Sequence, residues 1–405
     1  MKKRILTICC SLLLCFSVGC TAKGQTVIPE ESKLAQKGEW MEVNSYDREA
    51  YLIPYWHTRE IYNETVLFVG EKDSASLLYT PSEIVSVRNY GLDIVYEEGK
   101  DYVFENGKIQ RLPGSAIPYM EVNEYYRETP DRVVLEVRKD YVDIELPGVR
   151  YLKYGEADTF TKYQIAVSYK HDQPWQGTRV IGYKEKFNSF FDKVKNGNAK
   201  VLFFGDSITV GCNASGTVQG GEVSPFCESW PIMVTEYLQE KLDCKLNYVN
   251  KAIGGTNTRQ GLDRFDTDVL SESPDLLVIA YGMNDRKTPV ETYRLMIQQM
   301  IEWYHTVVPE GNVLLVSPML PNIESNWFEN QEKFESVLAE LAQEYDFCAL
   351  APVTSLHKDM LAAGKRYRDF TGNNVNHPND FIVRLYGQVI LKTILGEDFC
   401  SERYE

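Results

Sequence analysis

The chain has 405 residues, of which 43% are hydrophobic and 25% charged, and its formal net charge is −15 at pH 7. A chain this acidic will not be held by nucleic acid or by anionic lipid headgroups through charge, so we expect no nucleic-acid partner. Neutral substrates such as sugars fit this charge better, although solubility alone explains it equally well. The length predicts two domains.

Residues 1–19 have the pattern of a signal peptide. Three basic residues, Lys2 to Arg4, precede an apolar run over 5–18 that is too short to span a bilayer as a helix. The run ends in Ser17-Val18-Gly19-Cys20, which resembles a bacterial lipobox, although Leu is more usual than Ser at position 17. This resemblance implies lipidation of Cys20, export, and attachment to the cell envelope or cell surface through that anchor alone. Ordinary secretion with cleavage nearby is the alternative, and residues 20–39 are expected to form a tether.

Five cysteines follow the leader and the anchor: Cys212, Cys227, Cys244, Cys348 and Cys400. The number is odd, so at least one of them has no partner within the chain. A Cys212–Cys227 bridge is possible, but the spacing gives no disulfide framework, and isolated buried cysteines are common. No cysteine or histidine cluster indicates a metal site.

Residues 40–183 are predicted to form an N-terminal domain rich in strands. Apolar or alternating patterns predict strands over 133–137, 142–146 and 163–167, and turn sequences recur between such segments. Convincing amphipathic helices are absent from this part of the sequence. The pattern is typical of an all-β sandwich of the jelly-roll kind.

Residues 184–197 are expected to form a linking helix, and the pattern of the following domain, 198–398, alternates between strands and helices. Strands are predicted over 201–204, 246–249, 276–280, 313–317 and 347–350. Helices are predicted over 229–242, 259–270, 290–306, 328–345 and 380–394. Five short apolar strands separated by amphipathic helices indicate an α/β fold, a doubly wound, five-stranded parallel sheet with helices on both faces.

Four polar blocks follow predicted strands or lie near the C-terminus: Gly205-Asp206-Ser207, Gly254-Gly255, Gly282-Met283-Asn284-Asp285 and Asn376-His377-Pro378. Open α/β sheets bind their ligands at the carboxyl ends of the strands, where the first three blocks would lie. A serine hydroxyl is a weak nucleophile that needs a base within hydrogen-bond reach, and His377 would supply one. Taken singly, each block has a structural reading: a helix cap, a turn or a buried histidine.

The order of these blocks resembles the SGNH/GDSL hydrolase family of esterases and lipases, over roughly residues 198–395. The resemblance implies a flavodoxin-like hydrolase domain in which Ser207 is the nucleophile and His377 the base. It also implies an oxyanion hole made by the Ser207 and Gly255 N–H groups and the Asn284 side chain. No cofactor is needed for this chemistry, and Asp206 has a structural role in it.

The sequence departs from the family at Asn374, where the D-x-x-H segment normally has the aspartate that orients the histidine. An asparagine oxygen can fix the histidine tautomer but supplies no negative charge to stabilise imidazolium. Three possibilities remain: Asn374 as a neutral acceptor, a backbone carbonyl, or a flanking carboxylate from Asp369 or Asp380. We favour Asn374 as the third catalytic residue.

The function expected from the sequence is that of an exported, lipid-anchored serine esterase that removes short acyl groups, such as acetyl, from an acylated carbohydrate. Two alternatives stay open: a lipase or thioesterase acting on acyl lipids, and a glycan-binding protein with a weakened hydrolase domain. The aromatic residues Trp230, Trp327, Tyr281 and Phe328 fall near the predicted loops, but core packing is the commoner fate of a tryptophan.

Overall fold

The computed structural model describes residues 43–142, 144–197 and 199–399. The predicted signal peptide, the Cys20 anchor and the tether therefore lie outside the described residues. The described residues form one compact unit, and the boundary between two domains within it stays a prediction. None of the helices described in this unit is long and apolar enough to cross a bilayer.

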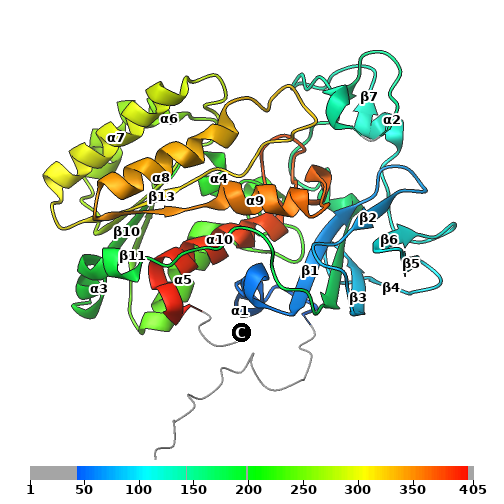
Figure 1. Cartoon of the computed structure of the whole chain (residues 1–405), viewed down its shortest axis with the longest axis horizontal. Helices are drawn as coiled ribbons and strands as arrows, with labels where there is room; N and C mark the ends of the chain where they lie inside the picture. Colours follow the sequence, from blue (N-terminus) through cyan, green and yellow to red (C-terminus); the bar gives the residue numbers. More distant parts are fainter. Residues whose placement is uncertain (1–42, 143, 198, 400–405) are drawn as a thin grey trace, which may run out of the picture. The chain divides into compact units, whose positions relative to one another are not determined.

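The N-terminal part contains antiparallel sheets, as the sequence predicts (Figure 1). The largest has the order β1-β9-β3-β4, with β1 at Glu60–Leu67, β9 at Gln164–Lys170, β3 at Glu83–Asn89 and β4 at Val95–Tyr96. A second has the order β2-β6-β5, with β2 at Ser74–Ser76, β6 at Lys108–Arg111 and β5 at Tyr102–Glu105. A third is the pair β7 (Tyr126–Arg127) and β8 (Tyr151–Leu152), and two short helices are α1 (Arg48–Tyr51) and α2 (Val122–Tyr125). The jelly-roll connection of these strands stays a prediction.

Two strands predicted in this part, over 133–137 and 142–146, are not formed as strands. Residues 133–137 form only isolated bridges, from Glu136 to Tyr151 and from Val137 to Ser325. The described residues of 142–146 form no strand and follow a 3₁₀ turn at Lys139–Tyr141. In 133–137 the alternation is real, since Leu135 and Val137 are buried and Val134 is exposed, but no strand pairs along the segment. In 142–146 the apolar series covers no sheet face, because Ile144 is 44% exposed. The strand predicted over 163–167 is correct and belongs to β9.

The C-terminal part contains the predicted five-stranded parallel sheet, in the order β11-β10-β12-β13-β14. Its strands are β10 at Lys200–Gly205, β11 at Asn247–Asn250, β12 at Leu276–Ala280, β13 at Asn312–Val316 and β14 at Cys348–Ala351. Almost every residue of β10, β12 and β13 is buried, which is the pattern of parallel strands covered on both faces. The order reverses beside β10, and ligands bind at such a switch point in open α/β sheets.

Helices cover both faces of this sheet (Figure 1). On one face α6 (Thr258–Asp263), α7 (Val290–Val307) and α8 (Phe334–Glu344) pack next to one another. Their apolar side chains form a buried cluster with alternate residues of the strands, including Leu202, Phe204 and Ile279. On the other face α5 (Trp230–Leu242) packs against α10 (Asp380–Leu395), where Trp230 stacks on Tyr386.

The predicted helices are confirmed with three differences. The helix predicted over 259–270 consists of α6 followed by a π-helical turn at Asp266–Leu270, and α8 begins at Phe334, six residues later than predicted. Helix α9 (Val353–Ala362) was not predicted. The linking helix corresponds to a 3₁₀ turn at Lys184–Phe187 and α3 (Asn188–Lys195), which buries Phe190, Phe191 and Val194.

Candidate active site

Ser207 lies two residues after the end of β10, at the carboxyl edge of the parallel sheet, between the ends of β11 and β12. It opens the short helix α4 (Ser207–Val210), whose first turn is capped by Asp206: the Asp206 carboxylate accepts the Ile208 N–H at 3.0 Å. Gly205 is required at this turn, because a Cβ there would lie 2.6 Å from the Ala280 carbonyl oxygen of β12. The tight turn therefore aims the Ser207 hydroxyl out of the sheet edge.

His377 meets Ser207 as the sequence predicts. The His377 Nε2 atom lies 2.8 Å from the Ser207 Oγ atom, and the two residues are 9% and 4% exposed. This distance suits proton transfer from a serine hydroxyl to an imidazole that acts as general base. Ser207 follows the carboxyl end of β10, and His377 lies in the loop before α10. These two segments are far apart in the sequence, and the fold brings them together.

The other nitrogen of the His377 ring faces two acceptors that the sequence did not predict. Nδ1 lies 2.8 Å from the Asn213 Oδ1 atom and 3.2 Å from the Glu156 Oε2 atom. Asn213 belongs to the loop after α4, and its amide nitrogen donates to the Ala157 carbonyl oxygen at 3.4 Å, which leaves its oxygen for the ring. Glu156 lies between β8 and β9, so a carboxylate from the N-terminal β region reaches the histidine.

Glu156 is ionised at neutral pH. Its burial would raise the pKa, but hydrogen bonding and charge interaction with His377, together with hydrogen bonds from Tyr154 and Asn373, outweigh this effect and lower the pKa to about 2. The Tyr154 hydroxyl donates to Glu156 Oε1 at 2.5 Å, and the Asn373 amide donates to the same oxygen at 3.3 Å. The second oxygen, Oε2, is thereby directed at the ring.

The prediction that Asn374 orients His377 is wrong. Asn374 is fully buried with its side chain in a different network: Oδ1 accepts from the Tyr125 hydroxyl and the Asn322 amide, each at 2.9 Å, and Nδ2 donates to the Lys153 carbonyl at 3.0 Å. The residue has a φ of +65°, a conformation that asparagine tolerates better than most residues. The presence of asparagine at position 374 is thus explained by its backbone conformation and by its side-chain hydrogen bonds.

The two flanking carboxylates do not reach the ring either. Asp369 accepts the Leu67 N–H at 2.9 Å and pairs with Arg366 at 3.0 Å, and Asp380 accepts the Ser215 N–H at 2.8 Å. A neutral acceptor is present, as favoured, but it is Asn213.

Asn373 fixes the loop that carries His377. Its Oδ1 atom accepts the backbone N–H groups of Val375, Asn376 and His377, each at 3.0 Å. The preceding Gly372 lets Asn213 approach, because a Cβ at Gly372 would lie 2.4 Å from the Asn213 Cβ. The loop is therefore set on both sides of the histidine.

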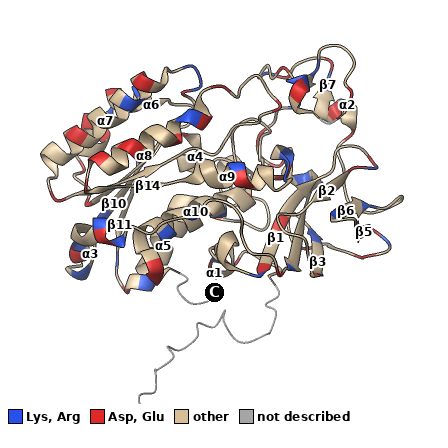
Figure 2. Ribbon diagram, in the orientation of Figure 1, with Lys and Arg blue, Asp and Glu red and all other residues tan. Residues whose placement is uncertain are grey.

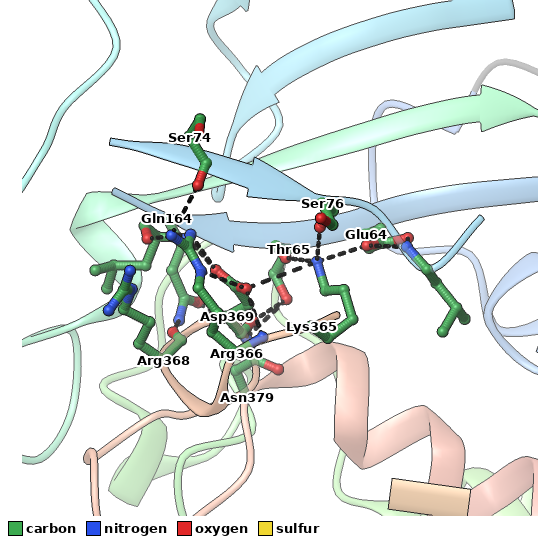
Figure 3. A network of polar contacts seen from close by, with 12 residues as sticks. Glu64, Thr65, Ser74, Ser76, Gln164, Lys365, Arg366, Arg368, Asp369 and Asn379 are labelled. Atoms are coloured by element: carbon green, nitrogen blue, oxygen red, sulfur yellow. Dashed lines mark hydrogen bonds and ion pairs between the residues drawn. The ribbon is translucent and has the colours of Figure 1, made fainter. Parts of the chain in front are cut away.

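A buried polar network joins this loop to strands β1 and β9 (Figure 3). The Lys365 ammonium pairs with the Glu64 carboxylate at 2.6 Å, and both side chains are 0% exposed. Figure 3 shows Lys365 also directed at Thr65 and Ser76, whose carbonyl oxygens lie 3.1 and 3.4 Å away. Asn379, two residues after His377, donates to Thr65 Oγ1 at 2.9 Å. The β region thus holds the loop that carries His377 through these contacts, and it also supplies Glu156.

An open pocket of about 560 Å³ surrounds Ser207, and we call it the catalytic pocket. Its lining residues are Val133, Tyr154, Glu156, Ala157, Ser207, Cys212, Val218, Gln219, Gly254, Gly255, Asn284, Trp327, Val375, Asn376 and His377. Of the four aromatic residues considered above, Trp327 lines this pocket, whereas Trp230 is fully buried.

The three predicted oxyanion donors also lie at the catalytic pocket. Gly255 has a φ of +76°, and no neighbouring atom lies within 4 Å of where a Cβ would be. The Asn284 amide donates one N–H to the Thr256 carbonyl oxygen at 3.0 Å, and an amide has a second N–H to give. Their role in binding an oxyanion stays a prediction.

The possible disulfide between Cys212 and Cys227 is absent. Both are free, as are Cys244 and Cys348 among the described residues, and Cys400 lies outside them. Cys227 is buried and Cys212 lines the catalytic pocket, so neither serves as a cross-link.

Residues 203–383 match the model of the GDSL-like lipase/acylhydrolase family. A search of curated proteins found no match. Solved structures with a similar fold include the acetylxylan esterase Axe2 from Geobacillus stearothermophilus, at 19% identity and a TM-score of 0.41, covering 51% of this chain and 96% of that one. Another is a two-domain esterase active on acetylated mannans, at 22% identity and a TM-score of 0.43, covering 56% of this chain and 57% of that one.

A third is LAE5, an α/β hydrolase from the metagenome of Lake Arreo, Spain, at 19% identity and a TM-score of 0.39, covering 50% of this chain and 96% of that one. Likenesses of this size say nothing about the substrate of this chain. The family match covers the segment from β10 into α10, which contains Ser207 and His377. The match supports a carboxylic ester hydrolase whose hydrolase region lies within residues 203–383.

Proposed function

We propose that this protein removes short acyl groups, acetyl above all, from an acylated carbohydrate, with Ser207 as nucleophile and His377 as base. The observation that supports the proposal is the chain of contacts from Ser207 Oγ through the His377 ring to Glu156, at the base of an open pocket. A pocket of this volume accommodates a small ligand such as a sugar unit, and Tyr154 and Trp327 offer aromatic contacts there.

The reaction would proceed in two steps. His377 Nε2 takes the proton of the Ser207 hydroxyl as the oxygen attacks the ester carbonyl, and the tetrahedral oxyanion is bound by the Ser207 and Gly255 N–H groups and Asn284. Collapse gives the acyl-enzyme and releases the sugar hydroxyl, which receives the proton from His377. Water, activated by the same imidazole, then hydrolyses the acyl-enzyme.

The catalytic pocket also has an apolar rim that favours a second candidate, hydrolysis of acyl lipids. Val133, Val218 and Val375 line the pocket, and Val218 is 74% exposed. A series of p-nitrophenyl esters from acetate to decanoate separates the two: we expect kcat/KM to be highest for acetate. A maximum at the long chains would contradict the short-acyl proposal and favour the lipid substrate.

The carbohydrate part is tested with acetylated oligosaccharides. We expect mass spectrometry to show loss of acetyl groups from the glycan with the wild-type protein and none with Ser207→Ala. Hydrolysis of p-nitrophenyl acetate without loss of acetyl from any glycan would leave an esterase with a different substrate. The alternative of a weakened hydrolase that only binds glycans is based on the missing aspartate at position 374. A carboxylate is nevertheless present beside His377, because Glu156 Oε2 lies 3.2 Å from its Nδ1 atom, and this argues against the alternative.

We further propose export and lipid anchoring through Cys20. The support is the sequence of the leader, with its basic start, apolar run and terminal Gly19-Cys20. Cys20→Ser should move the protein from the detergent phase to the aqueous phase or block its maturation. Unchanged partitioning of the variant would exclude lipidation at this cysteine.

A further inference from the structure

A second pocket, of about 450 Å³, adjoins the catalytic pocket at the N-terminal ends of α6 and α7. We call it the basic pocket, and its lining residues are Asn257, Arg259, Asn284, Arg286, Lys287, Thr288, Pro289, Thr292 and Met296. Asn284 lines both pockets, so the two share a wall beside the predicted oxyanion hole.

The charge of the basic pocket is opposite to that of the protein. Its lining includes three basic residues and no acidic one, in a chain with a net charge of −15. Figure 2 shows acidic residues along the neighbouring helices α7 and α8. A local basic site on an acidic protein attracts an anionic group that the rest of the surface repels.

Two of the three basic side chains are available to a ligand. Arg286 pairs with Glu329 at 2.9 Å, which neutralises its charge. Arg259 and Lys287 are exposed, and neither side chain has a hydrogen-bond or ion-pair partner among residues 43–142, 144–197 and 199–399. The basic pocket therefore presents two uncompensated positive charges.

The backbone adds to this positive potential. Helix α7 has 18 residues and begins after Pro289 with no side-chain cap, and Thr288, Pro289 and Thr292 line the basic pocket. The first N–H groups of such a helix lack partners within the helix, and its N-terminus carries a partial positive charge.

The wall between the pockets is suited to a sugar chain. The Arg286 guanidinium lies 4.5 Å from the centre of the Trp327 ring, and Trp327 lines the catalytic pocket. The salt bridge to Glu329 and the ring together hold Arg286 in this wall. A glycan whose acylated unit lies at Ser207 could thus extend past Asn284 and Trp327 toward Arg259 and Lys287.

We propose that the basic pocket binds the carboxylate of a uronic acid unit that neighbours the acylated sugar, so that the preferred substrate is an acidic acetylated polysaccharide. The proposal rests on the proposed function. A guanidinium and an ammonium both donate charge-assisted hydrogen bonds to a carboxylate, and neither interaction requires contact with the reacting ester.

The kinetic test compares two acetylated oligosaccharides that differ only in a glucuronic acid side unit. For the wild type we expect a higher kcat/KM with the acidic substrate, and a preference that shrinks as salt is added, because exposed charges are screened. The double variant Arg259→Gln/Lys287→Gln should lose about fivefold in kcat/KM on the acidic substrate only, the size expected for two exposed ion pairs. Lys333→Gln is the matched control, since Lys333 is exposed but does not line the pocket.

Equal kcat/KM values for the two substrates, or an equal loss on both in the double variant, would overturn the proposal. Hydrolysis of p-nitrophenyl acetate should be unchanged in the double variant, because this ester has no uronate. Absence of that hydrolysis in the wild type would instead count against the proposed function.

A binding measurement is independent of turnover. Titration of the Ser207→Ala protein with a deacetylated oligosaccharide should show tighter binding when the oligosaccharide carries glucuronate, and Arg259→Gln/Lys287→Gln should abolish the difference. An oligosaccharide with a phosphate in place of the uronate is the third ligand. Preference for the phosphate over the carboxylate would show that the assignment of the anion is wrong.

Discussion

The two nitrogens of His377 have different partners, and these set the chemistry of the ring. With the proton on Nδ1, the ring donates toward Asn213 Oδ1 and Glu156 Oε2, and Nε2 is free to accept the Ser207 hydroxyl. Asn213 at 2.8 Å can fix this tautomer, and the Glu156 carboxylate at 3.2 Å can stabilise the imidazolium that forms during attack. In the proposed mechanism, Asn213 and Glu156 would therefore share the two roles that one aspartate has in a serine triad.

This division predicts a graded response to mutation. Glu156→Gln removes the charge but leaves Asn213 to hold the tautomer, so we expect kcat on p-nitrophenyl acetate to fall by about 10- to 100-fold, less than when a triad carboxylate is the only acceptor. Adding Asn213→Ala should lower it further. Asp158→Asn, an exposed acid two residues away in the same loop, is the matched control and should be nearly silent.

Asn374→Ala tests whether Asn374 has a structural role and not the role of orienting His377. It should lower the melting temperature, because it leaves the Tyr125 hydroxyl and the Asn322 amide without their acceptor. If Asn374→Ala lowers kcat as much as Glu156→Gln does, in protein that is still folded, then the division of roles between Glu156 and Asn213 is wrong.

Asp206 gives a pH dependence of stability. Burial raises its pKa, with a further increase from the nearby Asp285 charge, to about 7 despite the hydrogen bond from the Ile208 N–H. The pKa of an unfolded aspartate is about 3.9, so the folded state binds the proton more strongly. The free energy of unfolding should therefore fall as pH rises from about 4 to 7.

Asp206→Asn removes this titration while keeping a side-chain oxygen for the cap. We expect the variant to gain stability relative to the wild type between pH 4 and pH 8, by at least about 1.4 kcal/mol, the equivalent of one pKa unit. Urea unfolding at the two pH values measures the difference. A constant difference across this range would show that Asp206 does not titrate within it.

At the scale of elements, the β region is part of the active site. The loop between β8 and β9 carries Glu156, and strands β1 and β9 hold the segment 365–379 that carries His377 (Figure 3). The ion pair of Glu64 and Lys365 in this junction is fully buried. A substitution in this ion pair should first lower the free energy of unfolding and then disturb the position of His377.

Lys365→Met tests this junction. It leaves the Glu64 carboxylate buried without its cation, and breaking a buried pair in this way costs about 3–5 kcal/mol. We expect a loss of this size in urea unfolding. The double variant Glu64→Gln/Lys365→Met should recover much of it, since no unpaired charge remains, and a double variant as unstable as Lys365→Met alone would contradict the explanation.

The parallel sheet was predictable from the sequence, and the short strands of the β region were less so. The β12 sequence, Leu276–Ala280, is a fully apolar run typical of a strand buried on both faces, and its predicted bounds are confirmed. The segments 133–137 and 142–146 have strand-like alternation, but alternation makes a strand only when a neighbouring strand is there to pair with it. That information lies in the tertiary structure.

At the scale of the whole molecule, the sequence predicted half of the catalytic arrangement. Ser207 and His377 stand in recognisable blocks at strand and helix ends, so their meeting could be expected. Glu156 stands in no block and comes from a different part of the fold. Its proximity to His377 depends on how residues 151–164 pass over the carboxyl edge of the sheet, and this chain offers no local pattern for that path.

The rate of p-nitrophenyl acetate hydrolysis by Ser207→Ala tests most directly whether Ser207 is the nucleophile. We expect kcat to fall by about 10⁴-fold or more, because the nucleophile itself is removed, while the melting temperature stays close to that of the wild type. Retention of most of the wild-type rate by a folded Ser207→Ala protein would contradict this role of Ser207.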